Sequence, residues 1–542
     1  MCGIYGSVVL GREEICDPSL DSLRRRGPDS VGLFKNGNVI LGQTRLAVID
    51  EKLSSDQPIV SGDLALVANG EIYNYREIRK LTGYRYSGTS DCEAILHVYH
   101  QFGIEGLKKL DGFYAFALYD KKKRKIILHK DAVGKKPLYI LRGDGGILFG
   151  SSVTVVTDNY KKKLTVNRPQ FQFYLREGFI HPRETIWKEV VPVLPGEIHE
   201  INVKSGKIKT SFLKRECSAP AGTSDAVIGR DIERLLDRAV AKRVSDLNHP
   251  VLLFSGGIDS TAIATFMLQH NPRTQLVSIR QPLPFLHDEP YVREASRILK
   301  VPVQFVNILT PRFYRDLEEF ISCLDQPLAA YGYYYLSALA LKAKEYGKVL
   351  FTGDGGDEVF YGYDSIDRWF APDLPIQAPE ILVGPPPGVP LSPYGLRAIS
   401  VGFLGPDFIK LDKATAEHQM EARCPYLDWE VMCYARNLPV DFWLRHKETK
   451  YPLKQILRAR GFSPSFINRR KVGFSYPFRT LMMPRYAHMI REIRKHRELL
   501  ESLIGESLGD ISLWKVHRRF DYFWRLFVLV RFIEFSGEKR FE

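Results

Sequence analysis

The sequence predicts two domains of different fold class. An α+β domain of layered sheets and helices comes first, followed by an α/β domain on a doubly wound parallel sheet with a helical C-terminal part. The chain has 542 residues, more than one hydrophobic core of ordinary size can serve. Its first 210 residues are mostly short alternating segments separated by tight turns, which is typical of hairpins. Beyond residue 226, continuous apolar segments alternate with amphipathic ones, which is typical of parallel strands and crossover helices.

The first domain, residues 1–210, is expected to be rich in β-hairpins because turn residues separate its alternating segments. Two stretches have helical spacing instead, and in the second of them Ile95, Val98 and Tyr99 recur on one face. The expected strands lie at 31–34, 39–43, 64–68, 113–119 and 126–129, with another hairpin around 143–146, and the expected helices lie at 75–81 and 91–110.

Residues 211–226 are predicted to be a linker, because the stretch from 214 onward has no apolar period. Residues 227–542 form the predicted second domain. Residues 365–411 include Pro385, Pro386 and Pro387 and are expected to be an irregular excursion, whereas the pattern beyond Asp412 is mostly helical. The expected elements are helices at 227–244, 260–269, 289–299 and 334–346, and strands at 251–254, 276–279 and 348–352.

The chain carries a formal net charge of +14, which is compatible with nucleic acid, anionic substrates or a generally basic proteome. The basic run at 121–125 lies between two expected strands, so we predict a solvated hairpin turn there. Basic tracts at 490–497 and 515–519 lie on expected helices with interspersed aromatic residues. They leave a polyanion-binding surface open as an alternative, although nucleic acid is not the partner that we expect.

No membrane association is expected. Charged residues interrupt the first apolar run, so no signal peptide is predicted. The most apolar late segment, 523–535, contains Arg525, Arg531 and Glu534, and we predict a buried helix there. None of the seven cysteines stands in a CxxC pair, so neither a disulfide framework nor a zinc site is predicted. A reducing cytoplasm is therefore the expected compartment.

Cys2 follows the initiator methionine directly. Removal of Met1 would make this thiol the first residue, and the new α-amino group, whose reference pKa is about 7.7 to 8.0, could act as its general base. A cysteine near a chain end is more often incidental. The catalytic interpretation of Cys2 therefore depends on the motifs that accompany it.

Two glycine-rich loops follow expected strands of the second domain. The first, Ser255–Ser260, could turn backbone amides and the positive end of a helix toward phosphate. Its Asp259 would need a cation beside phosphate, which suggests Mg²⁺. The second loop, Thr352–Glu358, offers further carboxylates. Each loop alone could be a purely structural turn, but two of them at strand ends favour a nucleotide site.

These features belong to a longer series of motifs that resembles the glutamine-dependent asparagine synthetase family. The resemblance runs nearly end to end. It implies an N-terminal class II glutamine amidotransferase domain of the layered αββα, Ntn type, followed by an ATP pyrophosphatase-type, PP-loop synthetase domain. The motifs are MCGI, RRGPDS, RLAVID, ANGEIYN, SGTSDCEA, DAVGKKPLY, VLPGE, SGGIDS, TGDGGDE, EARCPYLD and RRKVGF.

The resemblance assigns the first domain to glutamine hydrolysis. It implies that Cys2 attacks the side-chain amide of glutamine, giving a thioester and ammonia, and that Asn69 and the Gly70 amide form the oxyanion hole. Arg45 is the implied clamp on the α-carboxylate, with Glu71 and Asp91 on the α-ammonium. The backbone expected to line the pocket comprises Leu46, Ala47, Val48 and Ile49.

The resemblance assigns the second domain to ATP-dependent amide formation. An acceptor carboxylate is adenylated, and ammonia delivered through a dry interdomain tunnel displaces AMP. Lys471 is implied to neutralise pyrophosphate, Asp259 and Asp357 to bind Mg²⁺, and Asp354 and Arg423 to act at the acceptor, Asp354 as a catalytic residue. The implied ATP-binding residues are Leu253, Ser255, Gly256, Gly257, Asp259, Ser260, Ile279, Thr352 and Gly353.

Three departures from the family pattern concern the acceptor. Asp354 and Ser152 stand where Glu is usual, and Gln326 stands in the usual DEP motif. Shortening a carboxylate by one methylene can misplace it by roughly 1 Å, which is enough to weaken catalysis. Aspartate is the expected acceptor, with a uronic acid or biosynthetic intermediate as the alternative. A protein that kept the fold and lost turnover remains a further alternative, and a homodimer is a possible assembly.

Overall fold

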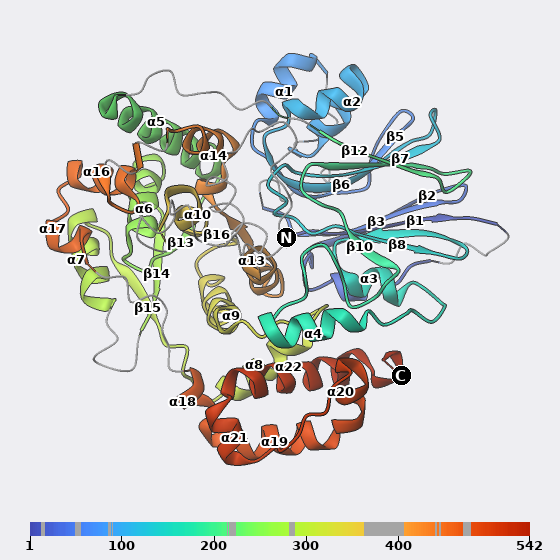
Figure 1. Ribbon diagram of the computed structural model, residues 1–542. Helices are drawn as coiled ribbons and strands as arrows, with labels where there is room; N and C mark the ends of the chain where they lie inside the picture. Colours follow the sequence, from blue (N-terminus) through green and yellow to red (C-terminus); the bar gives the residue numbers. More distant parts are fainter. Residues whose placement is uncertain are drawn as a thin grey trace.

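The computed structural model describes the chain apart from residues 12–16, 49–55, 85–87, 89, 214, 216–223, 281–287, 363–405, 440–441, 444–445, 470–477 and 542, and apart from the side chains of 406–408. Figure 1 shows the strand-rich N-terminal half beside a parallel sheet, with the C-terminal helices running beneath both. The predicted α+β and α/β domains are both present.

The N-terminal half contains two six-stranded antiparallel sheets that face each other. Residues such as Ile4, Val67 and Phe149 fill the space between them, as expected where the inner faces of two sheets pack together. The first sheet has the order β10 (Val190–Pro192), β8 (Tyr139–Gly143), β9 (Gly146–Gly150), β1 (Gly3–Val9), β3 (Val39–Arg45) and β2 (Ser30–Asn36). The second has the order β12 (Ile208–Phe212), β11 (Glu197–Asn202), β7 (Lys125–Lys130), β6 (Gly112–Asp120), β5 (Leu64–Ile72) and β4 (Ile59–Ser61).

Helices cover the outer faces of both sheets and complete the predicted αββα layers. Apolar residues of α2, such as Ile95 and Val98, pack on Leu66 and Phe116 of the second sheet. The expected helix at 91–110 is shorter than predicted, because the chain kinks at Gly103 and ends in a 3-10 turn. The elements are η1 (Asp21–Leu23), α1 (Tyr75–Thr82), α2 (Glu93–Gly106), η3 (Leu107–Lys109), α3 (Val153–Asp158) and α4 (Arg168–Glu177).

The second domain contains a five-stranded, wholly parallel sheet. Its order places β13 and β16 side by side at the centre, and the chain proceeds outward from each of them, so the topological switch point lies between these two strands. The short strands β15 and β17 were not predicted, since neither has an apolar run long enough to stand out. The order is β15 (Val303–Val306), β14 (Gln275–Ile279), β13 (Val251–Leu253), β16 (Val349–Phe351) and β17 (Glu421–Arg423).

Helices pack on both faces of the parallel sheet. Val251 and Leu252 belong to different cores, because successive side chains of a strand point to opposite faces. On the Leu252 side lie α5 (Asp225–Val244), α6 (Ile258–His270), α7 (Glu289–Leu299), α14 (Trp429–Arg436), α16 (Tyr451–Ala459) and α17 (Pro464–Ile467). On the Val251 side lie α8 (Phe313–Ser322), α9 (Tyr331–Ala343) and α13 (Pro406–Ala416). The short turns α10 (Gly356–Phe360) and η4 (Pro425–Leu427) follow β16 and β17.

The C-terminal part is helical, as predicted, and joins the two domains. Its long helix α22 contacts α4 of the first domain and α8 of the second, and Leu526 to Val530 are buried. The prediction of a buried helix at 523–535 is therefore confirmed. The elements are α18 (Phe478–Met482), η5 (Met483–Arg485), α19 (Tyr486–Lys495), α20 (Arg497–Ile504), α21 (Leu513–Arg518), α22 (Phe520–Ser536) and η6 (Glu538–Arg540).

Three further expectations concern membrane-spanning helices, the cysteines and the proline-rich segment. Among the described residues, no helix is long and apolar enough to span a membrane. Cys433 is disulfide-bonded, which departs from the prediction that the cysteines would form no disulfide framework, whereas four others are free, namely Cys2, Cys92, Cys323 and Cys424. The expected excursion at 365–411 lies almost wholly outside the described residues, and its last part belongs to α13.

Candidate active site

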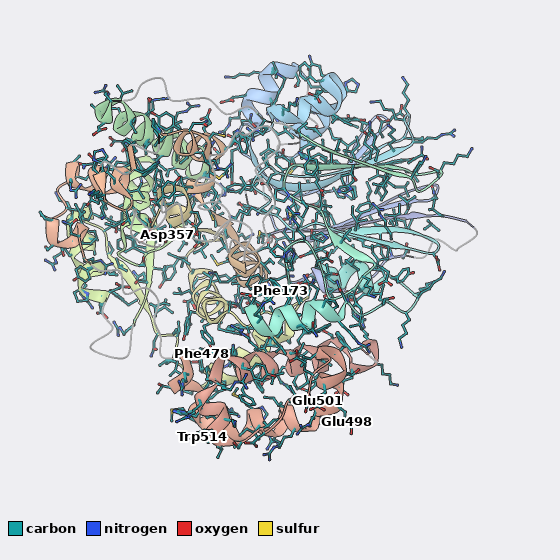
Figure 2. The ribbon with its side chains drawn as sticks, in the orientation of Figure 1. Phe173, Asp357, Phe478, Glu498, Glu501 and Trp514 are labelled. Atoms are coloured by element: carbon teal, nitrogen blue, oxygen red, sulfur yellow. The ribbon has the colours of Figure 1, made fainter. Side chains whose placement is uncertain are left out.

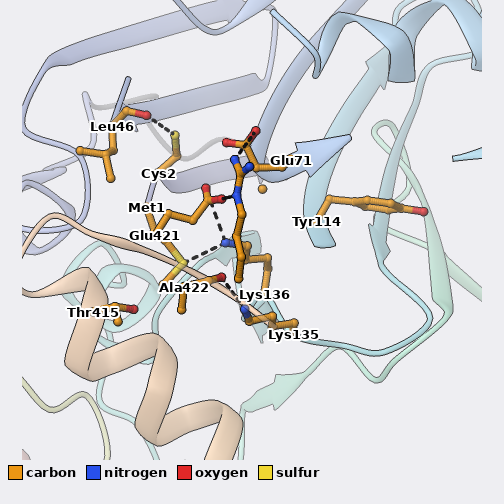
Figure 3. A network of polar contacts seen from close by, with 12 residues as sticks. Met1, Cys2, Leu46, Glu71, Tyr114, Lys135, Lys136, Thr415, Glu421 and Ala422 are labelled. Carbon is orange, nitrogen blue, oxygen red and sulfur yellow. Dashed lines mark hydrogen bonds and ion pairs between the residues drawn. The ribbon is translucent and has the colours of Figure 1, made fainter. Parts of the chain in front are cut away.

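Cys2 lies at the start of β1, between the two domains. Its thiol donates to the Leu46 carbonyl at 3.8 Å, and burial raises the pKa of this thiol. Met1 is buried beside it, with its α-amino group 3.4 Å from the Met420 carbonyl and its sulfur 2.9 Å from the Lys136 ammonium (Figure 3). The chain start is therefore enclosed by protein from both domains.

Asn69 and Gly70 lie on β5, which packs against β1. Asn69 is 0% exposed, and neither atom of its side-chain amide has a hydrogen-bond partner among the described residues. Such groups are costly to bury unless a ligand completes them. Gly70 has φ +146°, and a Cβ there would lie 2.1 Å from the Phe113 carbonyl oxygen on β6. Only glycine fits this position, so the implied oxyanion pair is built into the sheet.

The implied glutamine pocket surrounds the end of β3. Arg45 is buried and donates to Asp56 at 3.0 Å. The Ala47 amide donates to Asp29 at 2.8 Å, Leu46 is buried and Val48 is half-buried. Ile49 lies outside the described residues. Asp56 and Asp29 thus hold the segment that was expected to line the pocket, and the Leu46 carbonyl faces Cys2.

Glu71 and Asp91 are two buried carboxylates on one side of this pocket. Burial raises the pKa of both, and that of Asp91 reaches about 6. The Ile72 amide donates to Asp91 at 2.5 Å, and the Arg423 guanidinium lies 3.3 Å from Glu71. These acids share the Arg423 guanidinium with a third buried acid, Glu421, and the resemblance assigns Glu71 and Asp91 to the α-ammonium of glutamine.

Strand β17 connects the two halves through Arg423. The resemblance implies that Arg423 acts at the acceptor. In the structure its guanidinium contacts Glu421 at 2.8 Å and Glu71 of the first domain at 3.3 Å, so the Arg423 side chain points toward the glutamine pocket. The Arg423 carbonyl accepts from the Thr352 amide at 3.1 Å. One residue therefore touches both expected sites, and it is an interface residue.

The first glycine-rich loop lies at the C-terminal end of β13, beside the switch point. The hydroxyls of Ser255 and Ser260 are 3.1 Å apart. Gly256 has φ +66°, and a Cβ there would lie 2.8 Å from the Val292 amide of α7, so the loop needs glycine to pass this helix. Arg469 fixes the loop from outside by donating to the Gly256 carbonyl at 2.9 Å. The implied pocket residues Leu253 and Ile279 end the neighbouring strands β13 and β14.

The second loop, after β16, brings its carboxylates to the first. Asp259 and Asp357 both contact the Lys450 ammonium, at 2.5 and 2.6 Å, and Asp357 lies at the edge of the parallel sheet in Figure 2. The Asp354 amide donates to the Thr352 hydroxyl at 3.4 Å. Sequence reasoning missed Lys450, because nothing in its local pattern distinguishes it from other lysines. Lys471 lies outside the described residues.

Two of the departures from the family pattern are not near Asp354. Ser152 caps α3 by accepting from the Val155 amide at 3.1 Å. Gln326 accepts from the Ile186 amide at 3.1 Å. The Gln326 bond crosses between the domains, whereas the Ser152 bond stays within α3. Ser152 reaches the interface as part of the wall of a cavity between the domains. Of the three departures, Asp354 is the one that lies in the second glycine-rich loop.

The first domain presents a thiol beside an unsatisfied amide, and the second presents two phosphate-type loops at a switch point. This pairing defines an ATP-dependent, glutamine-hydrolysing ligase. Comparison with known families agrees: the glutamine amidotransferase domain matches residues 1–212 and asparagine synthase matches residues 231–382 and 401–519. The chain belongs to the glutamine-dependent asparagine synthetase family.

Individual relatives are similar over most of their length. Asparagine synthetase [glutamine-hydrolyzing] 1 of Arabidopsis thaliana is 28% identical, with 88% of this chain and 78% of the relative covered. Asparagine synthetase [glutamine-hydrolyzing] of Gallus gallus is 26% identical, with 96% and 90% covered. Asparagine synthetase [glutamine-hydrolyzing] 1 of Bacillus subtilis is 24% identical, with 95% and 92% covered. At these identities the relatives support the same general function for this chain, that of a glutamine-hydrolysing ligase.

Proposed function

We propose that the protein makes asparagine from aspartate, glutamine and ATP, releasing glutamate, AMP and pyrophosphate. The observation that carries this proposal is the position of Arg423. Its side chain contacts Glu71 in the glutamine pocket, while its carbonyl holds Thr352 at the nucleotide loop. Glutamine hydrolysis and adenylation are thereby built onto one shared strand, as a transfer of ammonia between them requires.

In the first step, the Cys2 sulfur attacks the amide carbon of glutamine. The carbonyl π electrons move to oxygen, where Asn69 and the Gly70 amide stabilise the charge, and collapse expels ammonia to leave a thioester. Water then hydrolyses the thioester to glutamate. Burial lowers the pKa of the Met1 α-amino group to about 5. Removal of Met1 would place a new α-amino group on Cys2 itself, and this group is proposed to take the thiol proton.

In the second step, ATP binds at the switch point between β13 and β16. The loop Ser255–Ser260 supplies amides and hydroxyls for phosphate, and Lys450 places a positive charge beside Asp259. The residues fit Mg²⁺ as well, because Asp259 Oδ1 is buried without a hydrogen bond among the described residues. Asp259 and Asp357 would hold the ion, which would neutralise phosphate charge. Lys471 is proposed to hold the departing pyrophosphate.

The acceptor is proposed to be aspartate, with another carboxylic acid as the alternative that Asp354 favours. Its shorter side chain leaves more space beside the α-phosphate than a glutamate would, and this space suits either a larger acceptor or a shifted one. Ammonia reaches the acyl-adenylate through the buried interface between the domains, where it stays un-ionised. The protein is expected to act in the cytoplasm.

The proposal is tested by incubating purified protein with glutamine, ATP, Mg²⁺ and aspartate and measuring asparagine and AMP. Equal yields of the two products are expected. Cys2→Ala should abolish synthesis from glutamine and retain synthesis from ammonium chloride. Pyrophosphate release with a uronic acid but not with aspartate would establish the alternative acceptor, and loss of both activities in Cys2→Ala would contradict the division of labour between the domains.

A further inference from the structure

A cavity of about 320 Å³ lies apart from both proposed sites, where the two domains meet the C-terminal helices. Its walls come from η1 and α3 of the first domain, the ends of α8 and α13 of the second, and the end of α22. The chain terminus lies beside α20 and α22 in Figure 1. The volume is at the lower end of the range for small-molecule sites, which suits a compound of about the size of an amino acid.

The charged groups in the wall are paired, with one exception. Arg26 pairs with Asp412, Lys413 with Asp325, and Arg540 with Asp158. The two other acids of the wall, Glu417 and Asp21, contact His418 and Arg24. Arg25 also lines the cavity, and the partner that the structure gives it is the Cys323 thiol.

Burial, followed by the charge of Glu417, raises the pKa of that thiol to about 12. The thiol is therefore neutral at physiological pH. Arg25 consequently carries a guanidinium charge that no carboxylate among the described residues neutralises, and a guanidinium in this situation favours an anion.

The rest of the wall is of two kinds. Hydroxyl groups from α3 and from the ends of α8 and α22 surround the charged residues. Aromatic rings form an apolar part: Trp187 stacks on Phe541 with ring centres 5.2 Å apart, and Phe532 meets Phe541 at 6.1 Å. A ligand that satisfies both kinds of wall has one anionic group on a compact apolar body.

We propose that this cavity is a binding site for a small organic anion, a carboxylate or phosphate carried on an aromatic or aliphatic group. Arg25 binds the anionic group, and Trp187 and Phe541 contact the apolar body. Phe541 follows η6, which is attached by the Arg540–Asp158 pair at 2.8 Å and by the His496–Glu538 contact at 2.9 Å.

The cavity also has a direct connection to the nucleophile. Arg26 lines the cavity, binds Asp412 through two hydrogen bonds of 2.7 and 3.1 Å, and donates from Nε to the Cys2 carbonyl at 3.2 Å. A ligand that shifts Arg26 therefore shifts the residue that carries the thiol. The site is regulatory in this proposal, and occupancy changes the rate of glutamine hydrolysis.

Calorimetry on the full-length protein tests the binding, which needs no turnover. The probes are 3-phenylpropionate and phenyl phosphate, with 3-phenylpropanol and acetate as controls for the missing charge and the missing apolar body. We expect saturable binding of one or both anionic aromatic probes and no binding of the two controls. The stronger of the two probes identifies the anionic group.

Three variants test the assignment of residues. Arg25→Gln should weaken the binding of the stronger probe by about 10- to 100-fold, the loss typical of a charge-assisted hydrogen bond. Arg25→Lys, which keeps the charge, should recover part of this loss. Thr154→Phe places a ring in the cavity from α3 and should abolish binding while ATP binding is retained.

Equal binding of 3-phenylpropanol and 3-phenylpropionate, or unchanged affinity in Arg25→Gln, would overturn the site. The regulatory step is measured as glutaminase rate with saturating probe. The rate should change in the wild-type protein and stay constant in Thr154→Phe. Binding without any change in rate would refute the connection through Arg26, and binding without glutaminase activity would count against the proposed function but not against the site.

Discussion

The two proposed sites differ in whether their buried polar groups have partners. In the glutamine pocket, the Asn69 amide is fully buried without a hydrogen-bond partner among the described residues. In the nucleotide pocket, Asp259 and Asp357 share the Lys450 ammonium, although Asp259 Oδ1 has no hydrogen bond among the described residues. An unsatisfied group costs stability until a transition state completes it, whereas a paired group stabilises the protein before substrate arrives. Substitutions in the first pocket should therefore affect the rate, and those in the second should affect both rate and stability.

The largest effect is expected for Lys450→Met. Two buried carboxylates would lose the cation that they share, and the free energy of unfolding should fall by about 3 to 5 kcal/mol, as for other broken buried pairs. Urea denaturation measures the change. Lys454→Met, one turn further along α16, is the control, because Lys454 pairs with a more accessible Glu448 at 3.2 Å. A loss in Lys450→Met no larger than in the control would contradict the comparison.

Asn69→Ala should lower the rate of glutamine hydrolysis by about 10²- to 10³-fold, as for loss of one oxyanion donor. Its free energy of unfolding should change by less than about 1 kcal/mol, because no hydrogen bond is lost. Asn74→Ala is the matched control. Asn74 donates to Lys109 at 2.8 Å and accepts from the Asp111 amide at 2.9 Å, so this variant should lose stability and keep its rate. The reverse pattern would show that Asn69 is structural.

The pH dependence of glutamine binding should report Asp91. Its pKa of about 6 in the folded protein means that the carboxylate is protonated below this pH and attracts an ammonium only above it. The KM for glutamine should therefore rise as pH falls through 6, by up to about tenfold per pH unit. Steady-state glutaminase assays from pH 5 to 8 measure this. Asp91→Asn should give a high KM with no such dependence, and a dependence that persists in the variant would assign it to another group.

The smallest effect is expected for Arg76→Met. Arg76 on α1 pairs with Asp246 of the second domain at 2.7 Å, but the arginine is largely exposed. Its loss should change the free energy of unfolding by less than about 1 kcal/mol. Arg26→Met, which breaks the buried Arg26–Asp412 pair between the same domains, should cost several times more. Equal effects would mean that burial does not decide the contribution of these pairs.

The sequence was informative about features that depend on neighbouring residues. Hairpins, crossover helices and the two glycine-rich loops are local patterns, because turn residues and apolar periods act over a few positions. The predicted domain classes are confirmed. Cys2 directly precedes β1, and Asn69 and Gly70 lie on β5 of the facing sheet. Loop Ser255–Ser260 and loop Thr352–Glu358 do meet at one edge of a parallel sheet.

By itself, therefore, the sequence determined two domains, their fold classes and the segments that carry the chemistry. The tertiary structure alone decided the pairing of Lys450 with Asp259, which lies 191 residues earlier, the direction of the Arg423 side chain, the place of Ser152 and Gln326 at the interface, and the cavity at Arg25. These features arise from contacts between distant segments, and no local period or turn signal encodes which side chains meet when sheets and helices pack.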